Sequence, residues 1–277
     1  MTVLAGVKRF FRDREGLKAF NAIPAEQRNL VLYAENEGYW TYFEPVFEAW
    51  RQRSDSSPVL YVTSSDTDPH LTSPPPGLQA FCVGDGAVRT MFFAGLEADV
   101  LLMTMPDLQT FHIKRSPHPV NYVYLHHSMV STHMIYRPEA FDHFDTILCA
   151  GPHHVDETRA REQSAGLSAK TLVEHGYGRL DAILAEGASG PRQRPPGAVP
   201  HVLVAPSWGE NGLLELHVDA LLDALQDTDL EVTIRPHPRT GLLRPDVISN
   251  LRSRIDKQPR FNYDDQPNAR DSLHAAD

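Results

Sequence analysis

The stretch Val120-Asn121-Tyr122-Val123-Tyr124-Leu125-His126-His127-Ser128-Met129 joins a short strand pattern to two adjacent histidines. Its β-branched and aromatic run, residues 122–125, is typical of a buried strand. In an open α/β sheet, ligands bind beyond the carboxyl ends of the strands. Neutral imidazole is the side chain best suited to accept a proton near pH 7. His126 and His127 are therefore candidate catalytic bases; the alternative is a histidine pair that only caps a strand.

Strand and helix patterns alternate on both sides of this stretch. Before it, strand patterns cover residues 29–34, 58–63, 78–83 and 99–103, and helix patterns cover 39–53 and 88–96. After it, strand patterns at 145–150 and 170–174 are separated by a polar helix that ends near residue 166. Such alternation predicts a mostly parallel sheet with helices on both faces.

Residues 187–200 (GASGPRQRPPGAVP) carry three glycines and four prolines, which is typical of a linker. The sequence therefore predicts an N-terminal α/β domain over 21–186 and a C-terminal one over 201–277. The latter shows strand patterns at 201–205 and 230–234, and helix patterns at 213–225 and within 245–257. We expect this second domain to be truncated, because two strands and two helices do not complete a sheet of this type.

Composition excludes several classes of protein. The formal charge of −10, from 26 Lys and Arg against 36 Asp and Glu, argues against a nucleic-acid partner. Cys82 and Cys149 lie in apolar strand patterns, which predicts buried thiols in a reducing compartment. The 14 histidines show no metal-ligand spacing such as HExxH, so neither a metal nor another cofactor is expected. No apolar run reaches the ~20 residues of a membrane span, which favours a cytoplasmic location.

Residues 1–20 are predicted to form a separate, basic amphipathic helix. Apolar residues from Val3 to Phe20 alternate there with five lysines and arginines, Lys8, Arg9, Arg12, Arg14 and Lys18. Helices of this kind lie on anionic membrane surfaces, which would place the protein peripherally at the inner face of the cell membrane. The alternative, which we favour, is a terminal helix that packs on its own domain.

Two strand ends in the C-terminal part suit a phosphate group. The loop at 206–212 contains Ser207, Trp208 and Gly209 between a strand and a helix, where backbone N–H groups attract anions. After the next strand comes Arg235-Pro236-His237-Pro238, in which side chains two residues apart lie on the same side of an extended segment. Arg235 and His237 are therefore candidate phosphate ligands. The alternative for Arg235 is an ordinary ion pair at the end of a strand.

Several short motifs, taken in order, resemble the CDP-glycerol glycerophosphotransferase family, which makes teichoic acids and related surface polymers. The resemblance runs over most of the chain from about residue 30. It is carried by residues 39–40 (YW), 105–108 (MPDL), 112–116 (HIKRS), 124–128 (YLHHS), 176–181 (GYGRLD), 205–208 (APSW) and 235–238 (RPHP).

The resemblance implies a GT-B-like fold, two Rossmann-like domains with the active site in the cleft between them. It implies attack of an acceptor hydroxyl on the β-phosphate of CDP-glycerol, with release of CMP. The acceptor would be a membrane-linked glycan or polyol phosphate. The family's proposed base matches His127, although Ser128 replaces the usual glycine and leaves His126 open. Its donor-phosphate His-Pro matches His237.

The family's Gly-x-Pro-Arg-x-Asp turn matches Gly176, Arg179 and Asp181, and Gly178 stands where proline is usual. The resemblance thus places Arg179 and Asp181 at the hinge of the cleft. Two alternatives of other kinds remain. One is a GT-B glycosyltransferase that uses a nucleotide sugar, and the other is a catalytically silent fragment or binding module.

Overall fold

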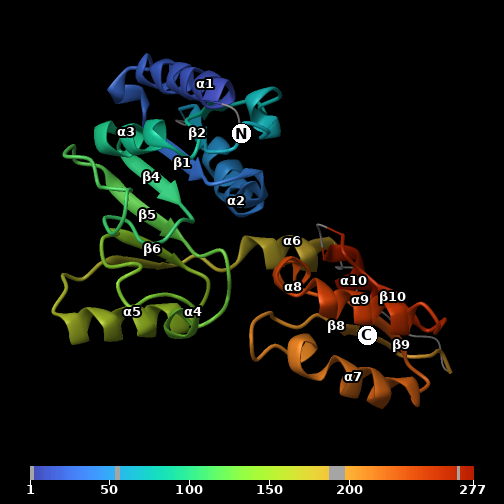
Figure 1. Ribbon diagram of the computed structural model, residues 1–277. Helices are drawn as coiled ribbons and strands as arrows, with labels where there is room; N and C mark the ends of the chain where they lie inside the picture. The colour runs from blue at the N-terminus through green and yellow to red at the C-terminus, as the bar shows by residue number, and fades with distance from the viewer. Residues whose placement is uncertain (1–2, 54–56, 187–196, 267–268) are drawn as a thin grey trace. The chain divides into compact units, whose positions relative to one another are not determined.

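Seven parallel strands form the larger of two sheets in the computed structural model, which describes residues 3–53, 57–186, 197–266 and 269–277 (Figure 1). The strands are β1 (Leu30–Ala34), β2 (Val59–Thr63), β3 (Leu78–Cys82), β4 (Val100–Met103), β5 (Asn121–Leu125), β6 (Thr146–Cys149) and β7 (Thr171–Glu174). Their order is β3-β2-β1-β4-β5-β6-β7. Each of the seven coincides with a predicted strand, so the sequence prediction of a parallel sheet is confirmed.

This strand order reverses direction between β1 and β4, which both pair with parallel neighbours. At such a switch point the loops that leave the carboxyl ends of the two strands diverge and open a crevice for ligands. β5 pairs directly with β4, so the histidines that follow β5 lie at the same edge.

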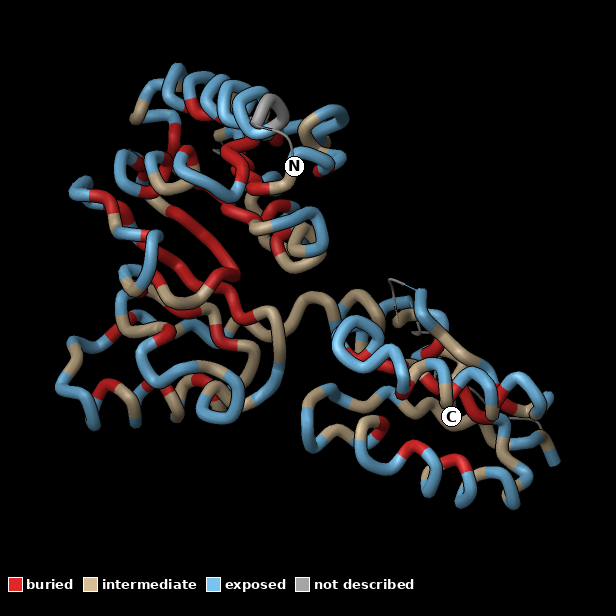
Figure 2. The backbone as a smooth tube through the Cα atoms, viewed as in Figure 1, coloured by how far each residue is buried: buried red, intermediate tan, exposed pale blue. Residues whose placement is uncertain are grey.

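Helices cover both faces of the sheet. They are α1 (Val3–Asn21), α2 (Trp40–Arg51), α3 (Ala87–Gly95), α4 (Thr132–Ile135) and α5 (Pro152–Ala165), with single turns at Ala25–Gln27, Glu37–Tyr39 and Pro69–Leu71. A further helix, α6 (Gly178–Glu186), follows β7. Val31 and Tyr33 of β1 share one core with α1 and α3, whereas Leu30 and Leu32 share the other with α2. Side chains of a strand alternate between its two faces, which is why a strand buried on both faces is almost wholly apolar (Figure 2).

Helix α1 packs against β3 and α3 through its C-terminal half. Leu17 and Phe20 are buried in the core, and a Cβ atom at Gly16 would lie 1.9 Å from the carbonyl oxygen of Cys82. Glycine therefore allows the helix to approach β3 closely. Packing on the first unit is the alternative that the sequence analysis favoured over a separate helix.

The described residues form two compact units, 1–181 and 182–277. Helix α6 runs across this division, and most of the predicted linker, residues 187–196, lies outside the described residues. The boundary at 187–200 therefore stays a prediction. Cys82 and Cys149 are both buried and unbonded, as predicted. Within the described residues, no helix has the length and apolar character that crossing a bilayer requires.

The second unit contains a parallel sheet of order β10-β9-β8. Its elements are β8 (His201–Val204), α7 (Leu213–Gln226), β9 (Glu231–Ile234), α8 (Pro238–Leu243), α9 (Pro245–Ile255), β10 (Phe261–Tyr263) and α10 (Arg270–Ala275). The expectation of only two strands was wrong, because the three-residue β10 is too short for a recognisable pattern. Apolar side chains of α7, α9 and all three strands build the core of this unit.

Candidate active site

His127 lies at the carboxyl edge of the first sheet among tyrosine side chains. Its ring centroid is 5.5 Å from that of Tyr39 and 5.7 Å from that of Tyr42, both edge to face. The ring centroid of Tyr124, in β5, lies 6.4 Å from that of His127, also edge to face. Burial among these rings lowers the pKa of His127, so the imidazole is held neutral at pH 7.

Two tyrosine hydroxyls fix the position of His127. Tyr177 donates a hydrogen bond to its carbonyl oxygen at 3.1 Å, and the Tyr124 hydroxyl lies 3.4 Å from its Nδ1. The Tyr124 hydroxyl also forms a hydrogen bond with Tyr136. Burial is the main cause that raises the pKa of Tyr124, and the interaction with Tyr136 raises it further. A Tyr124 proton directed to Tyr136 leaves its oxygen free to accept from Nδ1–H of His127. Nε2 then carries the lone pair, and it has no partner among the described residues.

Glu35 adds a carboxyl group to this edge, directly after β1. Glu35 is partly exposed. Burial raises its pKa, and the positive charge of Arg89 offsets part of this rise. Its negative charge is also among the causes that raise the pKa of Tyr39, after burial. Sequence analysis missed Glu35, Tyr42 and Tyr136 and gave no role to Tyr39, Tyr124 and Tyr177, although these three stand in the quoted motifs, because residues from separate elements share no spacing.

His126 is placed differently from its neighbour. It is 2% exposed, and its ring stacks on that of His154 at a centroid distance of 3.7 Å. Neither ring nitrogen has a hydrogen-bond partner among the described residues. Burial, helped by the nearby His154, His127 and His153, lowers the pKa of His126 to about 3. A ring so enclosed cannot meet a substrate at the edge of the sheet, which favours His127 of the two candidates.

The first turn of α6 contains both predicted hinge residues, and it brings one of them to the tyrosines. Arg179 donates a hydrogen bond to the Tyr42 hydroxyl at 3.2 Å, whereas Asp181 is exposed. A Cβ atom at Gly178 would lie 2.7 Å from the ring of Pro45 in α2, so a side chain there requires the helix to move. Gly176 has φ of +82°, a conformation that favours glycine.

In the second unit, the loop after β8 and the turn after β9 meet. The ring centroids of Trp208 and His237 are 6.0 Å apart, and the guanidinium of Arg239 lies 4.0 Å from the centre of the Trp208 ring. Nδ1 of His237 accepts a hydrogen bond from the Arg239 backbone N–H at 3.1 Å. Its Nε2–H therefore remains available as a donor. Burial and the charge of Arg239 lower the His237 pKa.

The other predicted residues of this unit differ in what they contact. Ser207 is exposed, and the N–H of Gly209 makes only a long contact, 3.4 Å, with Glu215. Arg235 bonds to Asp264 at 2.5 Å and to the Gln266 carbonyl oxygen at 2.6 Å. The structure thus shows the ion pair that was the alternative for Arg235. Arg239 was missed, because a residue just after a proline-flanked turn carries no motif. Within the described residues, no group of histidine, cysteine and carboxylate side chains is arranged to hold a metal.

Comparison with known proteins defines the fold. No protein-family model matches the chain, and no curated protein matches it. Among solved structures, the UDP-GlcNAc 2-epimerase of Methanocaldococcus jannaschii aligns with 89% of this chain and 75% of its own, with a TM-score of 0.54 at 12% identity. MnaA of S. aureus, solved with UDP, aligns with 90% and 72%, with a TM-score of 0.55 at 12% identity.

The wall teichoic acid polymerase TagF, in a structure soaked with CDPG, aligns with 99% of this chain and 71% of its own. Its TM-score is 0.52 at 13% identity. The chain therefore has a GT-B-like α/β fold, with one parallel sheet in each unit. At these identities, the likeness defines the fold alone.

Proposed function

We propose that this protein is a glycerophosphotransferase, which moves glycerol phosphate from CDP-glycerol to a hydroxyl group of a surface-polymer acceptor and releases CMP. The observation that carries the proposal is the neutral imidazole of His127 at the carboxyl edge of the first sheet, with no hydrogen-bond partner for Nε2 in the part of the chain that the structure describes. The order of the family motifs and the fold likeness to TagF support this choice of donor.

The proposed step begins at the acceptor. His127 Nε2 accepts the hydroxyl proton, and the acceptor oxygen forms a bond to the β-phosphorus of the donor. The bond from that phosphorus to the bridging oxygen breaks, and CMP leaves with the electron pair. The Tyr124 hydroxyl, which accepts from Nδ1–H, stabilises the imidazolium that forms. Tyr124 is thus a positioning residue, and His127 is the catalytic base.

The second unit is proposed to hold the donor phosphates. Charge on phosphate oxygens must be neutralised during transfer, and His237 Nε2–H, Arg239 and the loop with Ser207, Trp208 and Gly209 offer donors for this. Arg235 keeps three N–H groups that its contacts with Asp264 and Gln266 do not use. A donor role for Arg235 therefore remains part of the proposal, as does a hinge role for Arg179 and Asp181.

The test of the base is CMP release from CDP-glycerol in the presence of a lipid-linked polyol phosphate. We expect His127→Gln to lower kcat by ~10²–10⁴, the usual loss for a general base. Tyr124→Phe should lower kcat with KM nearly unchanged and should move the pH profile. His153→Gln is the matched control, since His153 contacts the Met129 carbonyl oxygen and not the tyrosines. Full activity of His127→Gln would refute the assignment.

The second candidate is a nucleotide-sugar enzyme. The fold likeness to the UDP-GlcNAc 2-epimerase and to MnaA with UDP favours it. A donor screen separates the candidates: CMP from CDP-glycerol supports the transferase, and UDP from a UDP-sugar supports the alternative. Release of neither nucleotide would indicate a binding module. The membrane-linked acceptor and an anionic membrane surface remain proposals of the same kind.

A further inference from the structure

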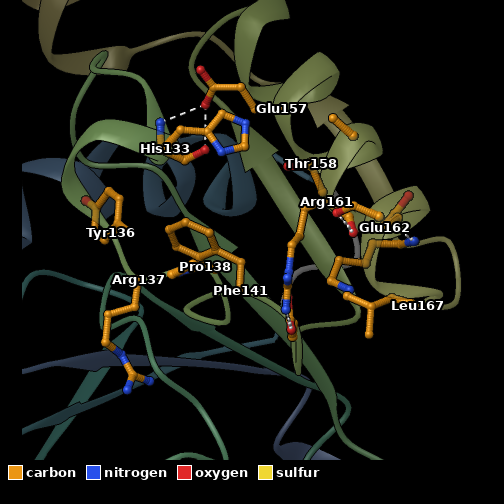
Figure 3. Close-up of a pocket in the computed structure, with 15 residues that line it drawn as sticks. His133, Tyr136, Arg137, Pro138, Phe141, Glu157, Thr158, Arg161, Glu162 and Leu167 are labelled. Atoms are coloured by element: carbon orange, nitrogen blue, oxygen red, sulfur yellow. Dashed lines mark hydrogen bonds and ion pairs between the residues drawn. The ribbon is translucent and has the colours of Figure 1, made fainter.

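A cavity of about 380 Å³ lies in the first unit, between α5 and the segment that includes α4 and residues 136–142 (Figure 3). Its volume falls in the range of small-molecule sites, roughly 300–1,000 Å³. Tyr136, Pro138 and Phe141 form one wall, and Arg161 and Leu167 lie opposite (Figure 3). The cavity thus combines an apolar surface with charged groups, as sites for small organic ligands do.

The carboxylates that line the cavity are already paired. Asp142 accepts two hydrogen bonds from Arg161, at 3.0 and 2.6 Å. Glu157 accepts from the backbone N–H and the hydroxyl of Thr132, and Glu162 accepts from Arg159 at 2.6 Å. Asp142 and Glu162 thus each have an arginine partner, whereas Glu157 is held by the uncharged donors of Thr132.

The cations that line the cavity are not all paired. Arg137 bonds to Asp107 at 3.0 Å, and Arg161 is held by Asp142. Lys170 is only 8% exposed, yet its ammonium group has no partner among the described residues. Only its backbone N–H is bonded, to Glu162 at 2.7 Å.

A lysine with so little exposed surface and no counter-charge is uncommon, because an ammonium group that loses part of its water needs an anion or hydrogen bonds in its place. One further cation adds to the positive character of the cavity. Arg161 bonds to Asp142 through Nε and one terminal nitrogen, so its other terminal nitrogen has no partner among the described residues. The exposed ring of His133 lies at the rim beside Glu157 (Figure 3).

We propose that this cavity binds a small organic anion, a phosphate monoester or a carboxylate, with the anionic group on Lys170 and Arg161 and the uncharged part against Phe141. A charge-assisted hydrogen bond to the anion supplies the partner that Lys170 lacks. The site shares Tyr136 with the surroundings of His127, but His127 itself does not line the cavity. The inference does not depend on the transferase proposal.

The test is calorimetry on the full chain with phenyl phosphate and benzoate as probes, and with benzyl alcohol as the neutral probe. We expect at least one anion to bind with a stoichiometry of one, and benzyl alcohol to bind at least tenfold more weakly. The tighter of the two anions identifies the anionic group. Failure of both anions to bind would overturn the proposal.

Two variants locate the binding. Lys170→Met keeps roughly the length of the side chain and removes its charge. It should lower the affinity for the anion at least tenfold. Ala160→Trp adds bulk from an exposed lining position without a change of charge, and should also abolish binding. Lys257→Met, which removes the same charge at an exposed position outside the cavity, is the control and should leave the affinity unchanged. Binding that survives both cavity variants would overturn the proposal, whether or not one of them folds poorly.

Discussion

His126 should make the first unit sensitive to acid, and His126→Phe should remove that sensitivity. The pKa of His126 is lowered to about 3 by burial and by neighbouring histidines, whereas an unfolded chain has a histidine pKa near 6.5. Below about pH 6.5 the unfolded state binds a proton that the folded state does not, so stability falls as pH falls towards 3. The full loss would be about 5 kcal/mol, from about 3.5 pKa units at 1.36 kcal/mol each.

Between about pH 7.5 and pH 5 the expected loss from this one group is about 2 kcal/mol. That is a large part of an ordinary stability of 5–15 kcal/mol. His127 and His154 also have pKa values lowered chiefly by burial. The stability of the wild type therefore falls by more, as pH falls, than the titration of His126 alone predicts. The quantity to measure is therefore the difference in pH dependence between the wild type and His126→Phe.

Urea unfolding followed by tryptophan fluorescence measures this difference. Trp208 is the only one of the three tryptophans in the second unit, so a Trp208→Phe background makes the signal report on the first unit. Phenylalanine keeps the ring that stacks on His154, and it cannot be protonated. His112→Phe, at an exposed position, is the control and should keep the wild-type pH dependence. Equal pH dependence in the wild type and His126→Phe would refute the argument.

Three further substitutions and one control, Gly95→Ala, test the packing of the two units by urea unfolding. Gly178→Ala should lower the free energy of unfolding by about 1–3 kcal/mol, because the new Cβ atom would clash with the proline ring of α2. At Gly95 a Cβ atom would have no neighbour within 4 Å, so Gly95→Ala should not destabilise the first unit. Phe20→Ala should cost about 3–5 kcal/mol by opening a cavity under α1; a smaller loss would mean that the helix is not docked. Arg235→Ala leaves Asp264 largely buried without a counter-charge, although Ser272 and the Gln266 backbone N–H still donate to it. It should destabilise the second unit by about 3 kcal/mol, as reported by Trp208, and no loss would mean that the ion pair is not structural.

Much of the fold could be predicted from the sequence, because a buried parallel strand is an unbroken apolar run. Residues 30–34 and 122–125 are such runs, and both are strands. Several of the elements that sequence analysis missed are short, since α8 has six residues and β10 three, whereas α6 has nine. Elements of that length are held by tertiary contacts, as β10 is by its register with β9, and local pattern carries little information about them.

The candidate site was predictable only where it follows a strand. His127 was found because β5 ends beside it, and its tautomer could not be inferred without the contacts of Tyr124. The distinction from His126 depends on the ring of His154, which lies 28 positions further along the chain. At Arg235 the sequence pattern suggested a role that a distant residue partly contradicts. Its pattern suits a phosphate ligand, but Asp264 from a later loop occupies part of the guanidinium.

Helix α1 shows how magnitudes decide between two roles for one pattern. Arg9 pairs with Asp85, and Arg12 pairs with Asp66, but exposed pairs contribute only about 0–1 kcal/mol each and would yield to anionic lipid. Burial of Phe20, which is 0% exposed, contributes about 2–3 kcal/mol to the docking of α1. Phe20 could contact lipid instead only if α1 left the sheet. The apolar face therefore keeps α1 on the first unit. Contact with a membrane would have to use the opposite face, where Phe11 is 57% exposed while the helix stays docked.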